Sequence, residues 1–131
     1  MTLQANSIVI AVDDLARAKK FYGEGLGCSI EKDFPHFVSF RLGDGGPELG
    51  LYTWEALAQD AGVPATRAAG FSGFSFHNIV DTRKQVDDLM QKAQRAGAKI
   101  VRLAEASKWG GYFGWFADPD GHLWKVVTQA S

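Results

Sequence analysis

The sequence lacks the features that several classes of protein require. Its single cysteine, Cys28, cannot form a disulfide within the chain, which excludes a disulfide-stapled scaffold and a cysteine-rich zinc site. The longest strongly apolar stretch near the start, residues 8–12, is far shorter than the ~20 residues of a membrane-spanning helix, and no basic segment precedes it. We therefore expect a cytoplasmic protein without a membrane partner, whose fold is held by its core.

An excess of charge of one sign is also missing. The 14 Lys and Arg residues balance 15 Asp and Glu residues, and no stretch of basic residues interleaves with aromatic ones. Because a phosphate backbone is bound through a basic field, we predict that the protein binds no nucleic acid. No Ser-His-Asp set, phosphate-binding loop or dinucleotide fingerprint is present. The length fits one domain over residues 1–131.

What the chain does contain is a repeat. Two amphipathic helices each follow a short apolar strand that ends in Val-Asp. Setting Val12 over Val80 places Ser7 over Ser75, and the glycines that end the two helices match after a small shift. A chance match is the alternative explanation. We favour duplication because the order of elements and the stop signals both repeat.

Each half is predicted to contain a strand, a helix and three more strands. In the first half, strands are expected at residues 7–12, 28–32, 37–42 and 48–52, with a helix capped by Asp13 or Asp14 and ended by Gly23 and Gly25. In the second half, strands are expected at residues 74–80, 99–103, 112–117 and 123–128, with a helix that begins in a capping box at Thr82 and Gln85 and stops at Gly97. A short helix is expected at residues 55–61. The modules thus span about 4–55 and 73–131, with a connector at about 56–72.

The repeated unit resembles the vicinal oxygen chelate superfamily, and so do two segments, FYGEGLG at residues 21–27 and DPDGHLW at 118–124. That superfamily includes glyoxalase I, bleomycin-resistance proteins and extradiol dioxygenases. The resemblance implies an α+β, glyoxalase-like fold in which two tandem βαβββ modules form a curved mixed sheet around a cleft. The activity has to be argued from the site, because one fold hosts many chemistries.

The resemblance also implies where a metal ion would bind. Metal-dependent members place one ligand, usually His or Glu, on the first and last strand of each module. The matching positions hold Ser7, Leu49, Ser75 and Lys125. A neutral hydroxyl binds a divalent ion weakly, an alkyl chain cannot bind it, and an ammonium group repels it. We therefore predict no metal and no cofactor; a one-residue register slip would bring in Glu48, which is one ligand where three or more are needed.

Two polar residues are the candidates for chemistry. His77 shares strand parity with Ser75, and Lys125 shares it with Leu123 and Val127, on faces that the resemblance assigns to the cleft. His77 is a candidate general base or hydrogen-bond donor, with a structural histidine as the alternative. Lys125 is a candidate anchor for an anionic oxygen, or an amine nucleophile or base. Its alternatives are a side chain that reaches solvent or pairs with a carboxylate.

Aromatic residues supply the expected walls of the cleft. Three of the four tryptophans lie within residues 109–124, and aromatic walls suit a flat ligand. By resemblance we place Trp115 in the cleft and Trp109 on its rim, with the core as the alternative location. Arg41 is a second candidate contact for an anion, with an exposed surface charge as its alternative. The expected ligand-binding set is Ser7, Arg41, Leu49, Ser75, His77, Trp109, Trp115 and Lys125.

We therefore predict a metal-independent superfamily member that binds a small, partly aromatic, neutral or anionic molecule in an aromatic-lined cleft. The alternative is a lyase or isomerase of the same superfamily, either metal-free with His77 and Lys125 as catalytic residues or metal-dependent with relocated ligands. Whether the protein is an enzyme stays open at this point. A module that binds a partner protein is a weaker third hypothesis. The resemblance also implies a homodimer.

Overall fold

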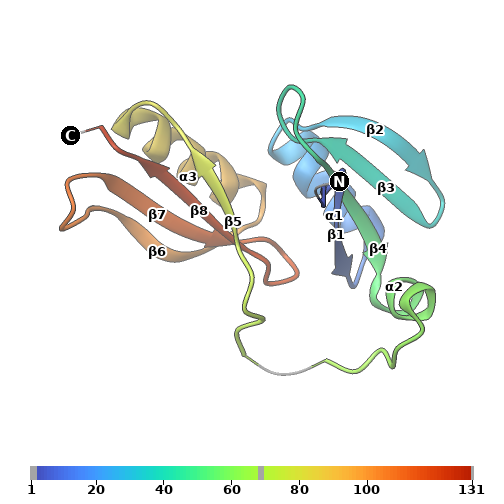
Figure 1. Cartoon of the computed structure of the whole chain (residues 1–131). Coiled ribbons are helices and arrows are strands. Elements are labelled where there is room, and N and C mark those ends of the chain that lie inside the picture. The colour runs from blue at the N-terminus through green and yellow to red at the C-terminus, as the bar shows by residue number, and fades with distance from the viewer. Residues whose placement is uncertain (1–2, 68–69, 131) are drawn as a thin grey trace. The chain divides into compact units, whose positions relative to one another are not determined.

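The fold repeats one arrangement of strands and helix in two parts of the chain. The computed structural model describes residues 3–67 and 70–130. The chain divides into two compact units, Met1–Ala68 and Ala69–Ser131, and each holds one four-stranded sheet (Figure 1). In each sheet the first strand pairs in parallel with the last, and the other pairs are antiparallel. The predicted α+β fold with two βαβββ modules is confirmed.

The first module contains a capped helix, as the sequence predicts. Its elements are β1 (Ser7–Val12), α1 (Leu15–Lys20), the π-helical turn η1 (Phe21–Gly25), β2 (Ser29–Phe34), β3 (Phe37–Arg41) and β4 (Glu48–Thr53), followed by α2 (Trp54–Ala61). Of the two candidate caps, Asp14 is the one used, because its carboxylate accepts a hydrogen bond from the Arg17 backbone N–H at 3.0 Å. The strands lie in the order β1-β4-β3-β2.

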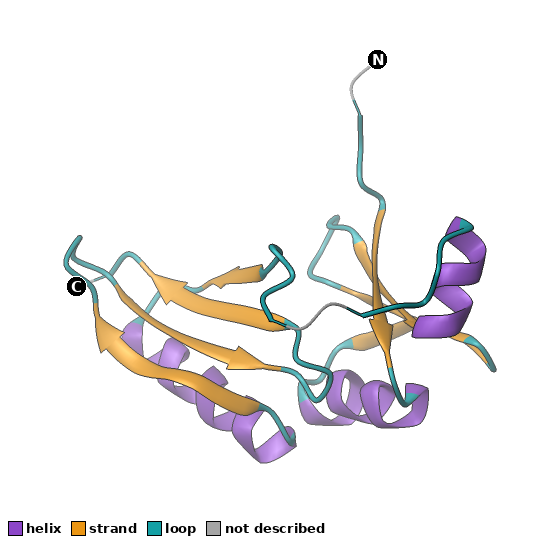
Figure 2. Ribbon diagram, turned by 90° about the horizontal axis from the view of Figure 1, so that it is seen from below, coloured by secondary structure: helices purple, strands orange, loops and turns teal. Residues whose placement is uncertain are grey.

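The second module has a longer helix with both predicted ends. Its elements are β5 (Phe76–Ile79), α3 (Arg83–Ala96), β6 (Lys99–Ala106), β7 (Tyr112–Ala117) and β8 (Leu123–Thr128), with the strands in the order β5-β8-β7-β6. Thr82 and Gln85 form the predicted capping box. Gly97 ends the helix with φ of 114°, a value that side-chain-bearing residues rarely adopt. In Figure 2 this long helix runs along one face of its sheet.

Strand registers repeat between the modules and fix which residues correspond. Ile8 pairs with Leu49 in the first module, and the corresponding residue Phe76 pairs with Trp124 in the second. One position further along the last strand, Gly50 therefore corresponds to Lys125. Both second strands also carry an irregularity at the same place, between Ile30 and Lys32 and between Ile100 and Arg102. This agreement in register supports the duplication.

The core of each module lies between its sheet and its main helix. In the first module, Phe40 and Leu49 are fully buried, and the ring of Phe40 lies 6.1 Å from that of Tyr22 in η1. In the second, Gly114 leaves room for Met90 of α3, since a Cβ at Gly114 would lie 2.8 Å from the Met90 Cε atom. Because side chains alternate along a strand, the neighbours of these residues point the other way. We call the surface turned away from α1 or α3 the far face of each sheet.

None of the helices in the described part of the chain is long and apolar enough to cross a membrane.

Candidate functional site

The far face of the second sheet holds a lysine surrounded by aromatic rings. The Nζ atom of Lys125 lies 4.9 Å from the centre of the Phe113 ring, 5.8 Å from that of Trp109 and 5.9 Å from that of Trp115. These distances are in the range of cation–π attraction. Among the described residues, no carboxylate forms an ion pair with Lys125. We call these four residues the Lys125 cluster.

His77 lies directly beside this cluster. It is the register partner of Lys125 across the parallel β5–β8 pair, and its ring meets that of Trp115 edge-on, with centroids 5.6 Å apart. The Oγ atom of Ser75 lies 3.1 Å from His77 Nε2, as expected for two residues on the same face of a strand. His77 is exposed. The structure thus brings Ser75, His77, Trp115 and Lys125 together on one face.

Two residues of this site escaped the sequence analysis. Phe113 shares strand parity with Trp115, so the sequence predicts that it lies on the same face. No sequence signal, however, indicates that it contacts Lys125. Arg102 lies with its guanidinium carbon 4.8 Å from the centre of the Phe113 ring and pairs with Glu105. The pairing of β6 is irregular on both sides of Arg102. The direction of the Arg102 side chain therefore cannot be predicted by counting alternate residues along the strand. Because Arg102 is paired, Lys125 is the cation of the site that has no carboxylate partner among the described residues.

On the first sheet, by contrast, the charged side chains of the far face pair with one another. Glu48 accepts a hydrogen bond from Ser39 Oγ at 3.0 Å, and its other carboxylate oxygen lies 3.5 Å from Lys32 Nζ. Arg41 donates from Nε to Glu31 at 3.1 Å, and this hydrogen bond raises the pKa of Arg41. Arg41 was expected to contact an anionic ligand, yet its guanidinium is already engaged by a carboxylate. Ser7 is exposed on β1 as the register partner of Glu48.

The expectation that Leu49 lines the ligand site is wrong. Leu49 is 0% exposed and pairs with Phe40, so its side chain belongs to the core under η1. The predicted phase of this strand is wrong by one residue, and a shift of one residue reverses the direction of every side chain. Glu48 points to the far face instead. By register with the second module, however, the residue that corresponds to Lys125 is Gly50.

The donor atoms do not fit the metal site that the resemblance implies. With the register corrected, its four positions hold Ser7, Gly50, Ser75 and Lys125. Glycine offers no side-chain donor, and an ammonium group repels a cation. In the part of the chain that the structure describes, no three His, Cys, Asp or Glu side chains are grouped so that they could hold a metal ion. The groups that the far face of the second sheet offers to a ligand are aromatic rings, an imidazole and an ammonium group.

Comparison with known proteins agrees with this architecture. The profile of the Glyoxalase/Bleomycin resistance protein/Dioxygenase superfamily matches residues 4–126. A glyoxalase-related enzyme from Fulvimarina pelagi has a similar structure with a TM-score of 0.86 and 30% sequence identity, covering 97% of this chain and 88% of that one. No curated protein matches the sequence significantly.

More distant structures share the fold alone. A glyoxalase/bleomycin resistance protein/dioxygenase family enzyme from Burkholderia phytofirmans PsJN is 23% identical with a TM-score of 0.80, covering 94% of this chain and 96% of that one. Lactoylglutathione lyase from Agrobacterium tumefaciens is 21% identical with a TM-score of 0.72, covering 95% and 92%. The match of the family profile over nearly the whole sequence, together with the relative at 30% identity, leads to one conclusion. The chain belongs to the Glyoxalase/Bleomycin resistance protein/Dioxygenase superfamily.

Proposed function

We propose that this protein binds a small, partly aromatic molecule, anionic or neutral, on the far face of its second sheet and does so without a metal ion. The observation that carries the proposal is the Lys125 cluster. Its rings offer flat surfaces for an aromatic group, and its ammonium group can contact a carboxylate or another oxygen that carries negative charge.

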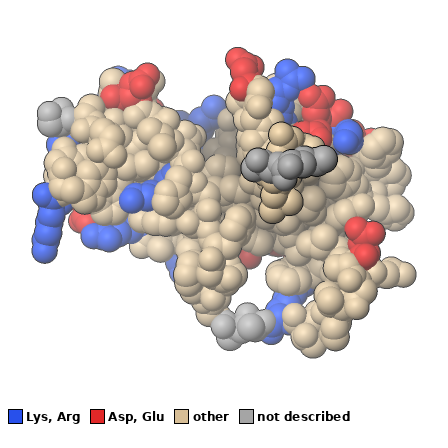
Figure 3. All heavy atoms as spheres, in the orientation of Figure 1, with Lys and Arg blue, Asp and Glu red and all other residues tan. Residues whose placement is uncertain are grey.

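The charge of the cluster selects the class of ligand. Cation–π contacts contribute about 0.5–1 kcal/mol each at exposed sites, so the rings hold the ammonium group in place without neutralising it. An anion that arrives there gains a charge-assisted hydrogen bond. A cationic ligand would instead meet a like charge. Figure 3 shows both basic and acidic side chains on the face of the molecule turned to the viewer.

A charge series on one aromatic ring tests the proposal. We expect 2-naphthoate to bind more tightly than 2-naphthamide, and 2-naphthylmethylammonium to bind most weakly, when each is titrated by isothermal calorimetry. In the Lys125→Met variant, 2-naphthoate should lose about tenfold in affinity, equivalent to ~1.4 kcal/mol, and the preference for the anion should disappear. Methionine keeps the length of the side chain and its contact with the rings.

Lys92→Met is the matched control. Lys92 is an exposed residue of α3, so the substitution removes the same charge without touching the far face. Its affinity for 2-naphthoate should equal that of the wild type. Equal affinities for the three naphthalene compounds, or equal losses in the two variants, would refute the assignment of Lys125.

A second candidate function is a metal-free lyase or isomerase, and the pairing of His77 with Lys125 favours it. A base and an ammonium group on neighbouring strands can remove a proton next to a carbonyl while the ammonium supports the resulting enolate oxygen.

Proton exchange in D₂O tests this second function. With 2-hydroxyacetophenone as the probe, an enzyme of this kind should speed deuterium uptake at the carbon next to the carbonyl above the buffer rate, as followed by NMR. His77→Asn and Lys125→Met should both abolish the acceleration, and the rate should depend on pH in a bell-shaped manner. Exchange at the buffer rate in the wild type would leave the protein as a binder.

A further inference from the structure

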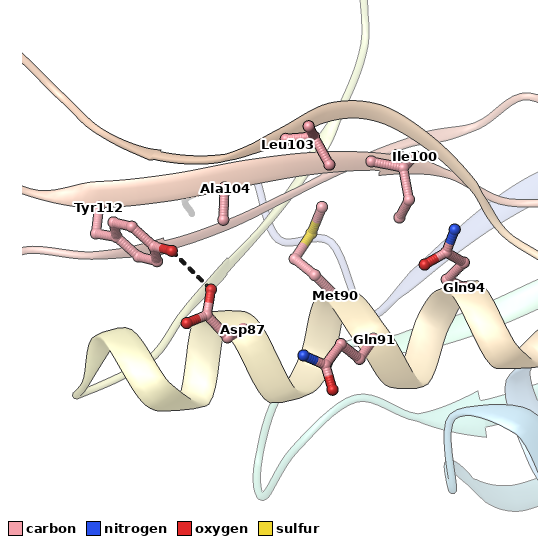
Figure 4. Close-up of a pocket in the computed structure, with 8 residues that line it drawn as sticks. All are labelled: Asp87, Met90, Gln91, Gln94, Ile100, Leu103, Ala104 and Tyr112. Atoms are coloured by element: carbon pink, nitrogen blue, oxygen red, sulfur yellow. Dashed lines mark hydrogen bonds between the residues drawn. The ribbon is translucent and has the colours of Figure 1, made fainter.

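A pocket lies in the second module, on the side of the sheet opposite to the Lys125 cluster. It is a hollow of about 320 Å³ between α3 and β6, at the lower end of the range for small-molecule sites (Figure 4). Met90 forms part of its apolar lining, and Leu103, 78% exposed, lies at its edge on β6. The pocket is built entirely within the second module.

The polar groups of this pocket are arranged unevenly. At one end, Tyr112 donates a hydrogen bond of 2.7 Å from its hydroxyl to Asp87 Oδ1, so these two groups satisfy each other. Gln91 and Gln94 line the pocket from α3, and their carboxamides make no hydrogen bond with the other described residues. A carboxamide both donates and accepts hydrogen bonds. Both residues are exposed, so the pocket offers an apolar lining with two solvent-facing amide groups at its edge.

From this arrangement we infer that the α3–β6 pocket is a second binding site, for a neutral small molecule with an apolar body and an amide-like group. Among the described residues, no Lys or Arg lines the pocket, and its one acidic residue, Asp87, is hydrogen-bonded to Tyr112. An anionic ligand would lie near the Asp87 carboxylate, and the cation beside the pocket, Arg83, lies over the Tyr112 ring and donates to the Ala130 carbonyl. A neutral amide can exchange donor and acceptor hydrogen bonds with Gln91 and Gln94. This site is independent of the Lys125 cluster.

Benzamide is a suitable probe because it combines a ring with a carboxamide. We expect it to shift the NMR signals of α3 and β6 in a saturable manner, including the side-chain NH₂ signals of Gln91 and Gln94. A ligand of this size should bind with a Kd on the order of 1 mM. Benzoate, which has the same ring and a negative charge, should bind there at least about fivefold more weakly, since it would lie near the Asp87 carboxylate.

The double variant Gln91→Met, Gln94→Met removes both carboxamides and keeps side-chain length and helix propensity. It should weaken benzamide binding about tenfold, given two hydrogen bonds of ordinary strength. Gln59→Met, at an exposed position of α2 in the first module, is the matched control and should leave the Kd unchanged. Lys125→Met should also leave it unchanged. The inference is overturned if benzamide gives no saturable shift up to about 10 mM, if the double variant binds as the wild type does, or if benzoate binds equally well.

Discussion

The hydrogen bond between Tyr112 and Asp87 ties β7 to α3, and removing it should have a measurable cost. Hydrogen bonds to charged groups contribute about 1.5–3 kcal/mol, and both residues are only half-buried, so we expect a contribution at or just below the lower limit of that range. Tyr112→Phe keeps the ring, over which Arg83 lies with its guanidinium carbon 5.0 Å from the ring centre. The variant should therefore lose about 1–1.5 kcal/mol in the free energy of unfolding.

The assay is urea unfolding of wild type and variant at a series of pH values. The loss corresponds to a fall of about 4 °C in Tm if the 131 residues unfold together. Tyr52→Phe is the matched control, because Tyr52 contacts the ring of Phe37 but has no hydrogen bond of its hydroxyl to another described residue. It should change the free energy of unfolding by less than about 0.5 kcal/mol.

The pH dependence supplies the sharper test. The hydrogen bond to Asp87, with desolvation and the charge of Asp87 as further causes, raises the pKa of Tyr112 above its ordinary value. A raised pKa in the folded state means that the contribution is complete below the unfolded tyrosine pKa of about 10 and is lost as the pH rises through the folded value. Wild type and Tyr112→Phe should thus differ equally at pH 7 and pH 9 and converge above pH 10. A difference that is absent at pH 7, or that persists undiminished at pH 11, would refute this reasoning.

Three other outcomes are expected. Gly111→Ala should destabilise the protein by about 2–3 kcal/mol in urea unfolding and shift its tryptophan emission, because the new Cβ would lie 2.5 Å from the Thr128 carbonyl oxygen and 2.2 Å from Trp109 Cζ3; unchanged emission would contradict the position of Trp109. After incubation with nickel, manganese, iron(II) or zinc and removal of loose ions, mass spectrometry should find far less than one ion per chain, whereas one ion per chain would contradict the proposed independence from metal. Light scattering should give twice the 14.3 kDa chain mass, as a homodimer requires, and a monomer mass at all concentrations would exclude it.

Local sequence signals predicted most of the fold. The Thr82 capping box and the stop at Gly97 define α3 without help from the rest of the chain, since both act within one helical turn. Strand boundaries were less exact: β6 extends to Ala106, three residues beyond the predicted end. A strand is stabilised by pairing with its neighbours, so its end depends on partners that are distant in the sequence.

Only part of the candidate site could be predicted, because the direction of a strand residue also depends on how the strand pairs with its neighbours. His77 and Lys125 were placed correctly on one face because β5 and β8 are regular. The prediction for Leu49 was wrong because its phase was counted back from Tyr52 without knowledge of the strand pairing. An error of one residue places the side chain on the opposite face of the sheet. Arg102 was missed because the irregular pairing beside it breaks the alternation on which such counting relies.

The repeat of the fold is not a repeat of the site, and this sets a limit on stoichiometry. At the place of Lys125, the first module has Gly50, and a Cβ there would lie 2.8 Å from the Phe37 ring, so that ring takes the space. In the first module the Phe37 ring thus fills this position, whereas the second module has the Lys125 ammonium group among aromatic rings there. Each chain should therefore accept one aromatic anion rather than two.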